Sequence, residues 1–228
     1  MERKGACSLT LAADGAQLFP NLLSAESIAR VEEILSHRPR EAGVRIYGDL
    51  RLSEWVGGTS AIGQLARSLL GTAARPVRAI LFDKNRDTNW ALDWHQDRTI
   101  AVRARAETQG FGNWTVKAGT PHVEPPFAVL ERMITARIHL DDVGEDNGPL
   151  LIAPGSHQLG RQEESEIGAA VARRGAIACL ASAGEVWVYK TAIVHSSKAS
   201  RYPKTRRVLH IDFAADDLPG SLEWAGIG

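Results

Sequence analysis

Residues 133–153, MITARIHLDDVGEDNGPLLIA, decide the fold. The run Met133–Leu140 is short and rich in apolar and β-branched residues, which favours an extended strand. The turn-forming residues Asp146-Asn147-Gly148-Pro149 follow, and Leu150–Ala153 is a second short apolar run. Short strands with such turn signals between them are typical of a β-sandwich or jelly roll.

The same pattern continues on both sides of this segment. Turn signals such as Pro154-Gly155 and Ala183-Gly184 separate the apolar runs, and one helix interrupts them from about Gln162 to Arg174. The other predicted strands are Pro76–Phe82, Ala176–Leu180, Glu185–Tyr189 and Arg206–Phe213. We therefore predict a mainly β fold with flanking helices.

The part of the chain before Pro76 is predicted to be helical. Ser24 can cap a helix whose apolar residues recur at helical spacing until Pro39 stops it. A second helix should begin near Ser60 and end at Gly71. We expect this helical support, about 20–71, to buttress a jelly-roll core of about 76–213 within a single domain of residues 1–228.

The segment from Arg105 to Pro126 has three glycines, three prolines and no clear period, which predicts a loop. A loop of this length in a compact domain is usually functional and often acts as a lid. Its mixed polarity favours a small polar or amphipathic substrate. The candidate substrate contacts in it are Trp114, Lys117, His122 and Glu124.

Charge and cysteine content count against some classes of protein without excluding them. Lys+Arg and Asp+Glu both number 27, so no field of one sign is available to attract nucleic acid or an anionic membrane. Two distant cysteines, Cys7 and Cys179, make no disulfide framework and favour a reducing cytoplasm. Cys179 lies in an apolar run and is expected to be a buried structural thiol. Since no apolar stretch approaches the length of a membrane span, we expect a cytoplasmic protein.

A His-x-Asp pattern occurs three times, although chance alone would give roughly 0.4 occurrences. On a strand, residues i and i+2 point to the same side, so the pattern places an imidazole beside a carboxylate. A second imidazole from a distant strand would complete a metal site with open positions, as non-haem iron(II) oxygenases require. The three pairs are His95/Asp97, His139/Asp141 and His210/Asp212, and His122-Val123-Glu124 is a carboxylate variant.

Order along the chain separates these pairs. No histidine follows His210 to serve as the distal ligand, so that pair is expected to be structural. His139 runs into an acidic turn whose carboxylates usually cap or solvate it, and this pair remains an alternative metal seat. The favoured site combines the pair at His95 with the distal His195, which follows a predicted strand and a short turn.

Arg206 opens an otherwise apolar strand about eleven residues after His195. A cation in such a place is costly to desolvate unless an anion pairs with it, and a guanidinium matches the geometry of a carboxylate. That anion is either a ligand or an ordinary salt-bridge partner from the chain.

Together these residues resemble the phytanoyl-CoA dioxygenase family of iron(II)/2-oxoglutarate oxygenases. Any one motif is weak, but five in the family's order, between about Phe82 and Phe213, are specific. They are WHQD at 94–97, DNGPL at 146–150, APGSH at 153–157, VH at 194–195 and RRVLHIDF at 206–213. The resemblance implies a double-stranded β-helix, which is a cupin-like jelly roll, with helices packed outside.

The resemblance also implies roles for individual residues. His95, Asp97 and His195 would bind Fe(II), and Arg206 would hold the distal carboxylate of the cosubstrate 2-oxoglutarate, helped by the Ser197 hydroxyl. Further candidates around the cosubstrate and the metal are Arg137, Lys84 and Trp94. With O2, such a site implies hydroxylation of an unactivated C–H bond of a small organic substrate, with release of succinate and CO2. Halogenases of this superfamily leave the carboxylate position vacant, so Asp97 favours hydroxylation or a related oxidation such as desaturation.

Two other functions could use the same side chains. A zinc-dependent hydrolase could use the His/Asp/His set with a metal-bound water, and it would turn over without iron or 2-oxoglutarate. A non-catalytic jelly-roll binding protein would consume no 2-oxoglutarate. An acyl-CoA substrate would want a basic patch, to which Arg103 and Arg105 or Arg173 and Arg174 could contribute, although solvated surface charge explains these arginines as well.

Overall fold

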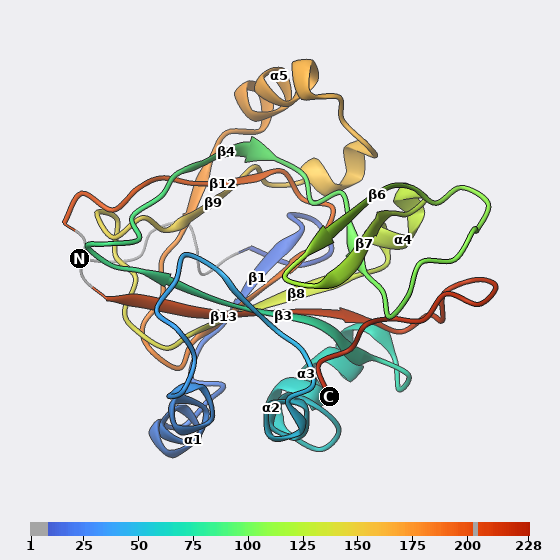
Figure 1. Ribbon diagram of the computed structural model, residues 1–228. Helices are drawn as coiled ribbons and strands as arrows, with labels where there is room; N and C mark the ends of the chain where they lie inside the picture. Colours follow the sequence, from blue (N-terminus) through green and yellow to red (C-terminus); the bar gives the residue numbers. More distant parts are fainter. Residues whose placement is uncertain (1–8, 203–204) are drawn as a thin grey trace.

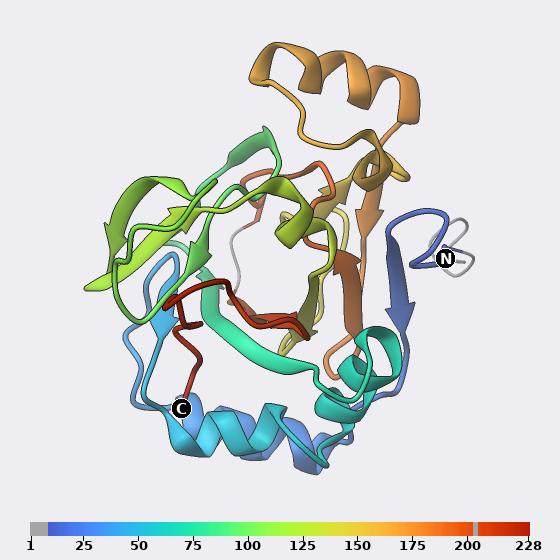
Figure 2. The same ribbon diagram turned by 90° about the vertical axis from the view of Figure 1, so that its right-hand side faces the viewer.

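The computed structural model describes residues 9–202 and 205–228, and two antiparallel sheets that face each other form its centre (Figures 1 and 2). The larger sheet contains β1 (Ala16–Phe19), β2 (Val44–Ile46), β3 (Arg75–Lys84), β8 (Ile134–His139), β11 (Val186–Lys190) and β13 (Arg206–Ala214). Its spatial order is β1-β11-β8-β13-β3-β2. The strand opened by Arg206 therefore lies inside the sheet, paired with β8 on one side and with β3 on the other.

The opposite sheet has the order β10-β9-β12-β4. Its strands are β4 (Leu92–His95), β9 (Leu150–Ile152), β10 (Ile177–Cys179) and β12 (His195–Ser197). A third, three-stranded sheet of order β5-β7-β6 lies beside them and contains β5 (Ile100–Ala101), β6 (Gly112–Lys117) and β7 (Thr120–Glu124). This arrangement confirms the predicted jelly-roll fold class.

Three helices cover the outer face of the six-stranded sheet: α1 (Ala25–Leu35), α2 (Leu50–Val56) and α3 (Ala61–Leu70) (Figure 1). The predicted caps are present, because the Ser24 and Ser60 hydroxyls accept the backbone N–H groups of Ser27 and Gly63. Gly71 ends α3 with a φ of 97°. Apolar side chains from these helices and from the sheet form one core cluster, as expected for a helical support outside the chemistry.

Two further helices lie elsewhere on the sandwich. The short helix α4 (Phe127–Glu131) precedes β8, and α5 (Glu164–Arg174) lies over the four-stranded sheet (Figure 1). A reciprocal capping box between Glu163 and Glu166 starts α5 two residues after the predicted beginning.

The prediction of a loop from Arg105 to Pro126 was wrong, because β6 and β7 form a hairpin there. Its two-residue turn, Ala118-Gly119, has φ values of 51° and 78°, and alanine seldom signals such a turn. Pro121 lies inside β7, where a proline argues against a strand. The short elements β1, β2 and α2 were not predicted either.

The remaining expectations concern the thiols and the membrane. Cys179 is buried, and burial raises the pKa of its thiol to about 12, which confirms a structural cysteine. Cys7 lies outside the described residues. No helix in the described ranges is both long enough and apolar enough to cross a membrane.

Candidate metal centre

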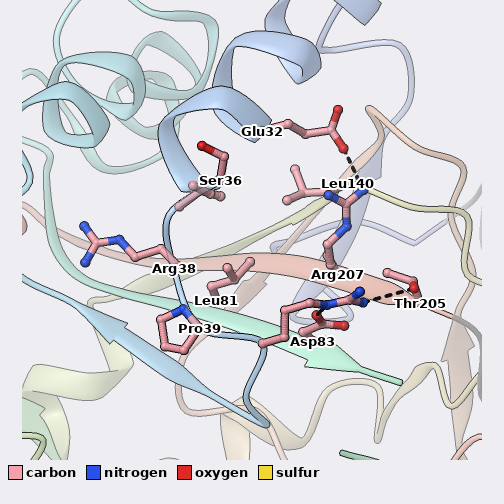
Figure 3. Close-up of a pocket in the computed structure, with 11 residues that line it drawn as sticks. Glu32, Ser36, Arg38, Pro39, Leu81, Asp83, Leu140, Thr205 and Arg207 are labelled. Carbon is pink, nitrogen blue, oxygen red and sulfur yellow. Dashed lines mark hydrogen bonds and ion pairs between the residues drawn. The ribbon is translucent and has the colours of Figure 1, made fainter. Parts of the chain in front are cut away.

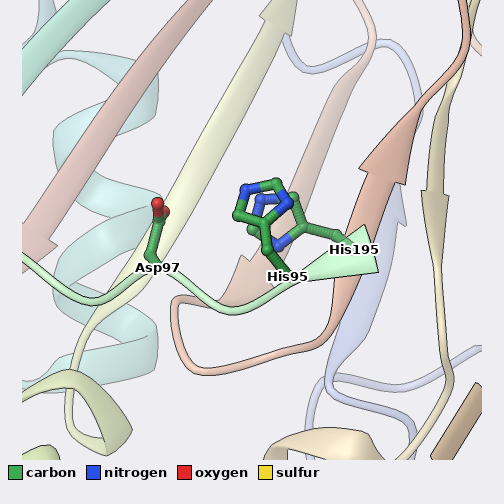
Figure 4. A group of neighbouring side chains, drawn as sticks. All are labelled: His95, Asp97 and His195. Atoms are coloured by element: carbon green, nitrogen blue, oxygen red, sulfur yellow. The ribbon is translucent and has the colours of Figure 1, made fainter. Parts of the chain in front are cut away.

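Strands β4 and β12 place two histidines opposite each other. His95 and His195 are direct cross-strand partners, and their ring centroids are 4.3 Å apart. Asp97 follows two residues after the end of β4, and its carboxylate points to the same side (Figure 4). One ligand atom from each of the three residues lies within 4.8 Å of the others, and no other such group of three occurs in residues 9–202 and 205–228.

Backbone hydrogen bonds set the tautomers of both histidines. Nδ1 of His95 lies 2.7 Å from the Asp93 carbonyl oxygen, and Nδ1 of His195 lies 2.9 Å from that of Ile193. A carbonyl oxygen only accepts, so each Nδ1 carries the proton and donates it. The lone pair of each Nε2 is therefore free, which is the usual arrangement of a histidine that binds a metal.

The pKa shifts of His195 and Asp97 also suit a cation. Burial, followed by the neighbouring His95, lowers the pKa of His195 to about 4, so this imidazole is neutral at pH 7. Burial alone would raise the pKa of Asp97, but the charges of Arg78 and then His195 outweigh burial and lower it. Arg78 lies 3.5 Å from Asp97 and donates from Nε to Asp212 at 2.5 Å. The site thus offers the neutral imidazole of His195 and the carboxylate of Asp97 beside the imidazole of His95.

The two competing His-x-Asp pairs have other partners. Nδ1 of His139 contacts the Glu185 carbonyl oxygen, and burial, followed by the charge of Arg137, lowers the pKa of His139 to about 3. Asp141 accepts hydrogen bonds from the Arg207 guanidinium. Nε2 of His210 lies 3.0 Å from Asp212, which itself holds Arg78.

A cavity of about 380 Å³ opens beside the three ligands, a volume within the usual range for small-molecule sites. Apolar and aromatic walls come from both sheets, and they include Phe82, Trp90 and Tyr189. One carboxylate, Asp97, lines the cavity. Six cationic side chains line it as well: Arg45, Arg78, Arg98, Lys117, Arg137 and Arg206.

Arg206 lies at one end of this cavity and is 1% exposed. It forms no ion pair with any described residue, and its Nε has no hydrogen-bond partner. Burial, followed by the charge of Arg137, lowers the pKa of Arg206 to about 9, so it remains a cation at neutral pH. The sequence left two possible anions for this guanidinium, a ligand or a carboxylate of the chain. Among the described residues no carboxylate forms a salt bridge with it.

Lys84 and Ser197 lie beside Arg206. Lys84 is the cross-strand neighbour of Arg206, and its Nζ donates to the Ser197 hydroxyl at 2.8 Å and to the Lys198 carbonyl. Burial, followed by the charges of Arg206 and Arg137, lowers the pKa of Lys84 to about 7. Nε of Arg137 is also buried without a hydrogen bond. The unpartnered Nε atoms of Arg137 and Arg206, with Lys84 and Ser197 beside them, form a cradle that fits a buried carboxylate.

The predicted substrate contacts lie in different places. Lys117 lines the cavity, whereas Trp114 packs in an apolar cluster behind the hairpin. His122 is fully buried, with Nδ1 at 3.0 Å from the Thr120 carbonyl oxygen. Glu124 accepts hydrogen bonds from Asn113 and Arg161. Trp114, His122 and Glu124 therefore do not line the cavity. Trp94 packs against a small apolar cluster beneath α5.

Arg45 and Arg78 are cavity residues that sequence reasoning missed. Arg78 carries the same signal as Arg206, a cation within an apolar strand, so the desolvation argument could have found it. Arg45 comes from a strand of three residues, which is too short to show a pattern.

A second cavity, of about 210 Å³, lies between α1 and the outer face of the large sheet (Figure 3). Its charged groups are paired within the chain. Arg40 donates to Asp83 at 2.8 Å, and Arg207 bridges Glu32 and Asp141 at 2.6 and 2.7 Å. These pairs tie α1 to β13, and we assign them to the fold.

Comparison with known proteins gives one family match. The family described as "Phytanoyl-CoA dioxygenase (PhyH)" matches residues 12–208. No curated protein matches the sequence.

Three solved structures show the same fold. AviO1 from Streptomyces viridochromogenes Tue57 is 20% identical, with a TM-score of 0.66 over 96% of this chain and 97% of that one. EctD from S. alaskensis with 2-oxoglutarate and 5-hydroxyectoine is 15% identical, with a TM-score of 0.67 over 94% and 76%. HygX from Streptomyces hygroscopicus with nickel, 2-oxoglutarate and hygromycin B is 12% identical, with a TM-score of 0.60 over 90% and 84%. At these identities the likeness establishes the fold alone.

Proposed function

The chain belongs to the phytanoyl-CoA dioxygenase family and is an iron(II)- and 2-oxoglutarate-dependent oxygenase, and we propose that it hydroxylates an unactivated C–H bond of a small organic substrate. Iron(II), when bound, supplies the oxidative chemistry: O2 gives one oxygen atom to 2-oxoglutarate, which leaves as succinate and CO2, and the other to the substrate. Small molecules accompany the same fold elsewhere, since the EctD structure contains 5-hydroxyectoine and the HygX structure contains hygromycin B.

One observation carries the assignment of the site. The imidazoles of His95 and His195 and the Asp97 carboxylate, with ligand atoms within 4.8 Å of one another, line a cavity that also contains the buried Arg206, which has no ion-pair partner among the described residues. A metal centre alone would not need the buried Arg206 cation. A cosubstrate with a carboxylate at each end would use both the metal ion and Arg206.

Each side chain then has a distinct task. His95, Asp97 and His195 hold the iron and leave its other positions open. Arg206 binds the distal carboxylate of 2-oxoglutarate, and Ser197, Lys84 and Arg137 surround it. Trp94 supports the metal-binding segment through packing, and the apolar walls of the cavity exclude water from the reaction.

Replacing Asp97 with alanine tests the metal site. We expect Asp97→Ala to reduce bound iron and to lower succinate formation by at least about a hundredfold, because loss of the carboxylate removes the one negative ligand. Metal content and succinate release are the measurements. The matched control is Asp93→Ala, which removes an exposed carboxylate from β4, four residues before Asp97, and leaves the carbonyl that orients His95.

The same assay separates the other interpretations. Normal iron binding and turnover in Asp97→Ala would remove Asp97 from the ligand set. A loss of iron in His139→Ala, but not in His95→Ala, would move the metal to His139/Asp141. Turnover without iron or 2-oxoglutarate would identify a hydrolase, and failure of the wild type to consume 2-oxoglutarate would identify a binding protein.

A further inference from the structure

Four of the six cationic side chains that line the cavity form two separate groups. Arg137 and Arg206, with Lys84 beside them, occupy the proposed cosubstrate end. Arg45 and Lys117 line the cavity from β2 and from the end of β6. We call Arg45 and Lys117 the second cationic pair.

The sheet register separates the two groups. Arg206 pairs with Lys84, and Arg45 pairs with Ile80, four residues earlier on the same strand. At about 3.3 Å per residue and about 4.8 Å per strand, the roots of Arg45 and Arg206 lie about 13 Å apart along β3 and about 10 Å apart across it. One carboxylate held by Arg206 therefore leaves the second cationic pair without an anion.

Electrostatic effects follow the same division. Burial lowers the pKa of Lys117, followed by the charges of Arg45 and Arg78, and the more weakly acting Asp97 only partly offsets them. The charges that act on the pKa of Arg206 are instead those of Arg137, Asp83 and Asp141. The cations within each group therefore repel one another.

The second cationic pair has no anionic partner among the described residues. Nε of Arg45 is buried without a hydrogen bond, and Nζ of Lys117 makes a 3.2 Å hydrogen bond to the neutral Thr99 hydroxyl. Of the other cations of this region, Arg78 is ion-paired with Asp212, and Arg98 donates to the Gln162 carbonyl, away from the second cationic pair's own partner Thr99. Two like charges that are partly desolvated without a counter-ion are unfavourable unless a ligand supplies one.

We infer that Arg45 and Lys117 form an oxyanion-binding subsite for the substrate, so that the substrate carries a carboxylate or a phosphate group. The inference rests on the proposed function, because it takes the Arg206 end to be filled by 2-oxoglutarate. The subsite would fix the anionic end of the substrate while a C–H bond of the remainder lies beside the metal-binding residues.

The test uses the full chain with zinc(II) in place of iron and with saturating 2-oxoglutarate, so that no turnover occurs. Inorganic phosphate and acetate are titrated separately at constant ionic strength, and dissociation constants are measured from NMR shifts of the amide groups of β2 and β6. In Arg45→Gln and Lys117→Gln we expect binding of the preferred anion to weaken by at least about tenfold, as for loss of a charged hydrogen bond. Arg103→Gln, which removes an exposed charge, controls for net charge.

The outcomes distinguish this inference from the function on which it rests. Tighter binding of phosphate or of acetate assigns the group that the subsite takes. Equal anion binding in Arg45→Gln, Lys117→Gln and wild type overturns the subsite, as does a loss of 2-oxoglutarate binding in these two variants. If the zinc-loaded wild type does not bind 2-oxoglutarate, or if Arg206→Gln binds it normally, the cosubstrate assignment itself fails.

Discussion

Arg206 and Arg207 are adjacent on β13 and have opposite surroundings. Strand alternation directs Arg206 into the cavity, where no described carboxylate meets it, and Arg207 toward α1. Hydrogen bonding to Asp141 raises the pKa of Arg207, whereas burial lowers that of Arg206. An arginine side chain therefore stabilises the fold at position 207 and is available for a ligand at position 206.

Lys84 would give the proposed cosubstrate site a pH dependence. A lysine binds an anion best when protonated, and the pKa of Lys84 in the free protein is lowered to about 7. Its charged fraction therefore falls from about nine-tenths at pH 6 to about one-tenth at pH 8. Affinity for 2-oxoglutarate should be highest below pH 7 and should fall by up to about tenfold as pH rises through that window.

Titration calorimetry on the zinc-loaded protein at pH 6, 7 and 8 measures this effect. Lys84→Met should bind 2-oxoglutarate weakly and with a flatter pH profile. An unchanged slope in that variant would show that another group titrates.

At the scale of single elements, the turn before β9 links a sequence motif to the cosubstrate site. Gly148 has a φ of 59°, and a Cβ there would lie 2.6 Å from the Lys198 carbonyl oxygen and 3.1 Å from Nζ of Lys84. Gly148→Ala should therefore lower stability by about 1–3 kcal/mol and displace the lysine from its carbonyl. We expect weaker 2-oxoglutarate binding by calorimetry and an earlier urea transition. Gly144→Ala, in the same turn with open space around it, should change neither.

The elements also show what the sequence could and could not predict. Helices α1 and α3 were predictable because serine caps and a terminal glycine mark their ends. The three proposed ligands could be chosen from order along the chain, although their spacing alone had two competitors. Lys117 was among the predicted substrate contacts, but the hairpin that carries it and its neighbour Arg45 could not be predicted, because Pro121 hides β7 and the three-residue β2 has no readable period.

At the scale of the molecule, the helical layer stabilises a site that it does not touch. Leu52 of α2 is fully buried against the outer face of the large sheet, on the side away from the cavity. Leu52→Ala should lower the free energy of unfolding by about 2–5 kcal/mol without changing metal affinity in the folded protein. Urea unfolding and metal titration are the measurements. Leu50→Ala, in the same helix at 76% exposure, should stay within about 0.5 kcal/mol of wild type.

The position of β13 determines how late in synthesis the large sheet can be completed. It is the last described strand in the chain, yet it lies between β3 and β8 in the sheet. While the ribosome is still adding residues before Arg206, those two strands have no partner between them, and closing the sheet requires contacts between distant segments, which form slowly. The side chains of the proposed metal site therefore emerge earlier than the arginine proposed to hold 2-oxoglutarate. If Arg206 holds the cosubstrate as proposed, oxidative chemistry therefore has to await the insertion of β13 into the sheet.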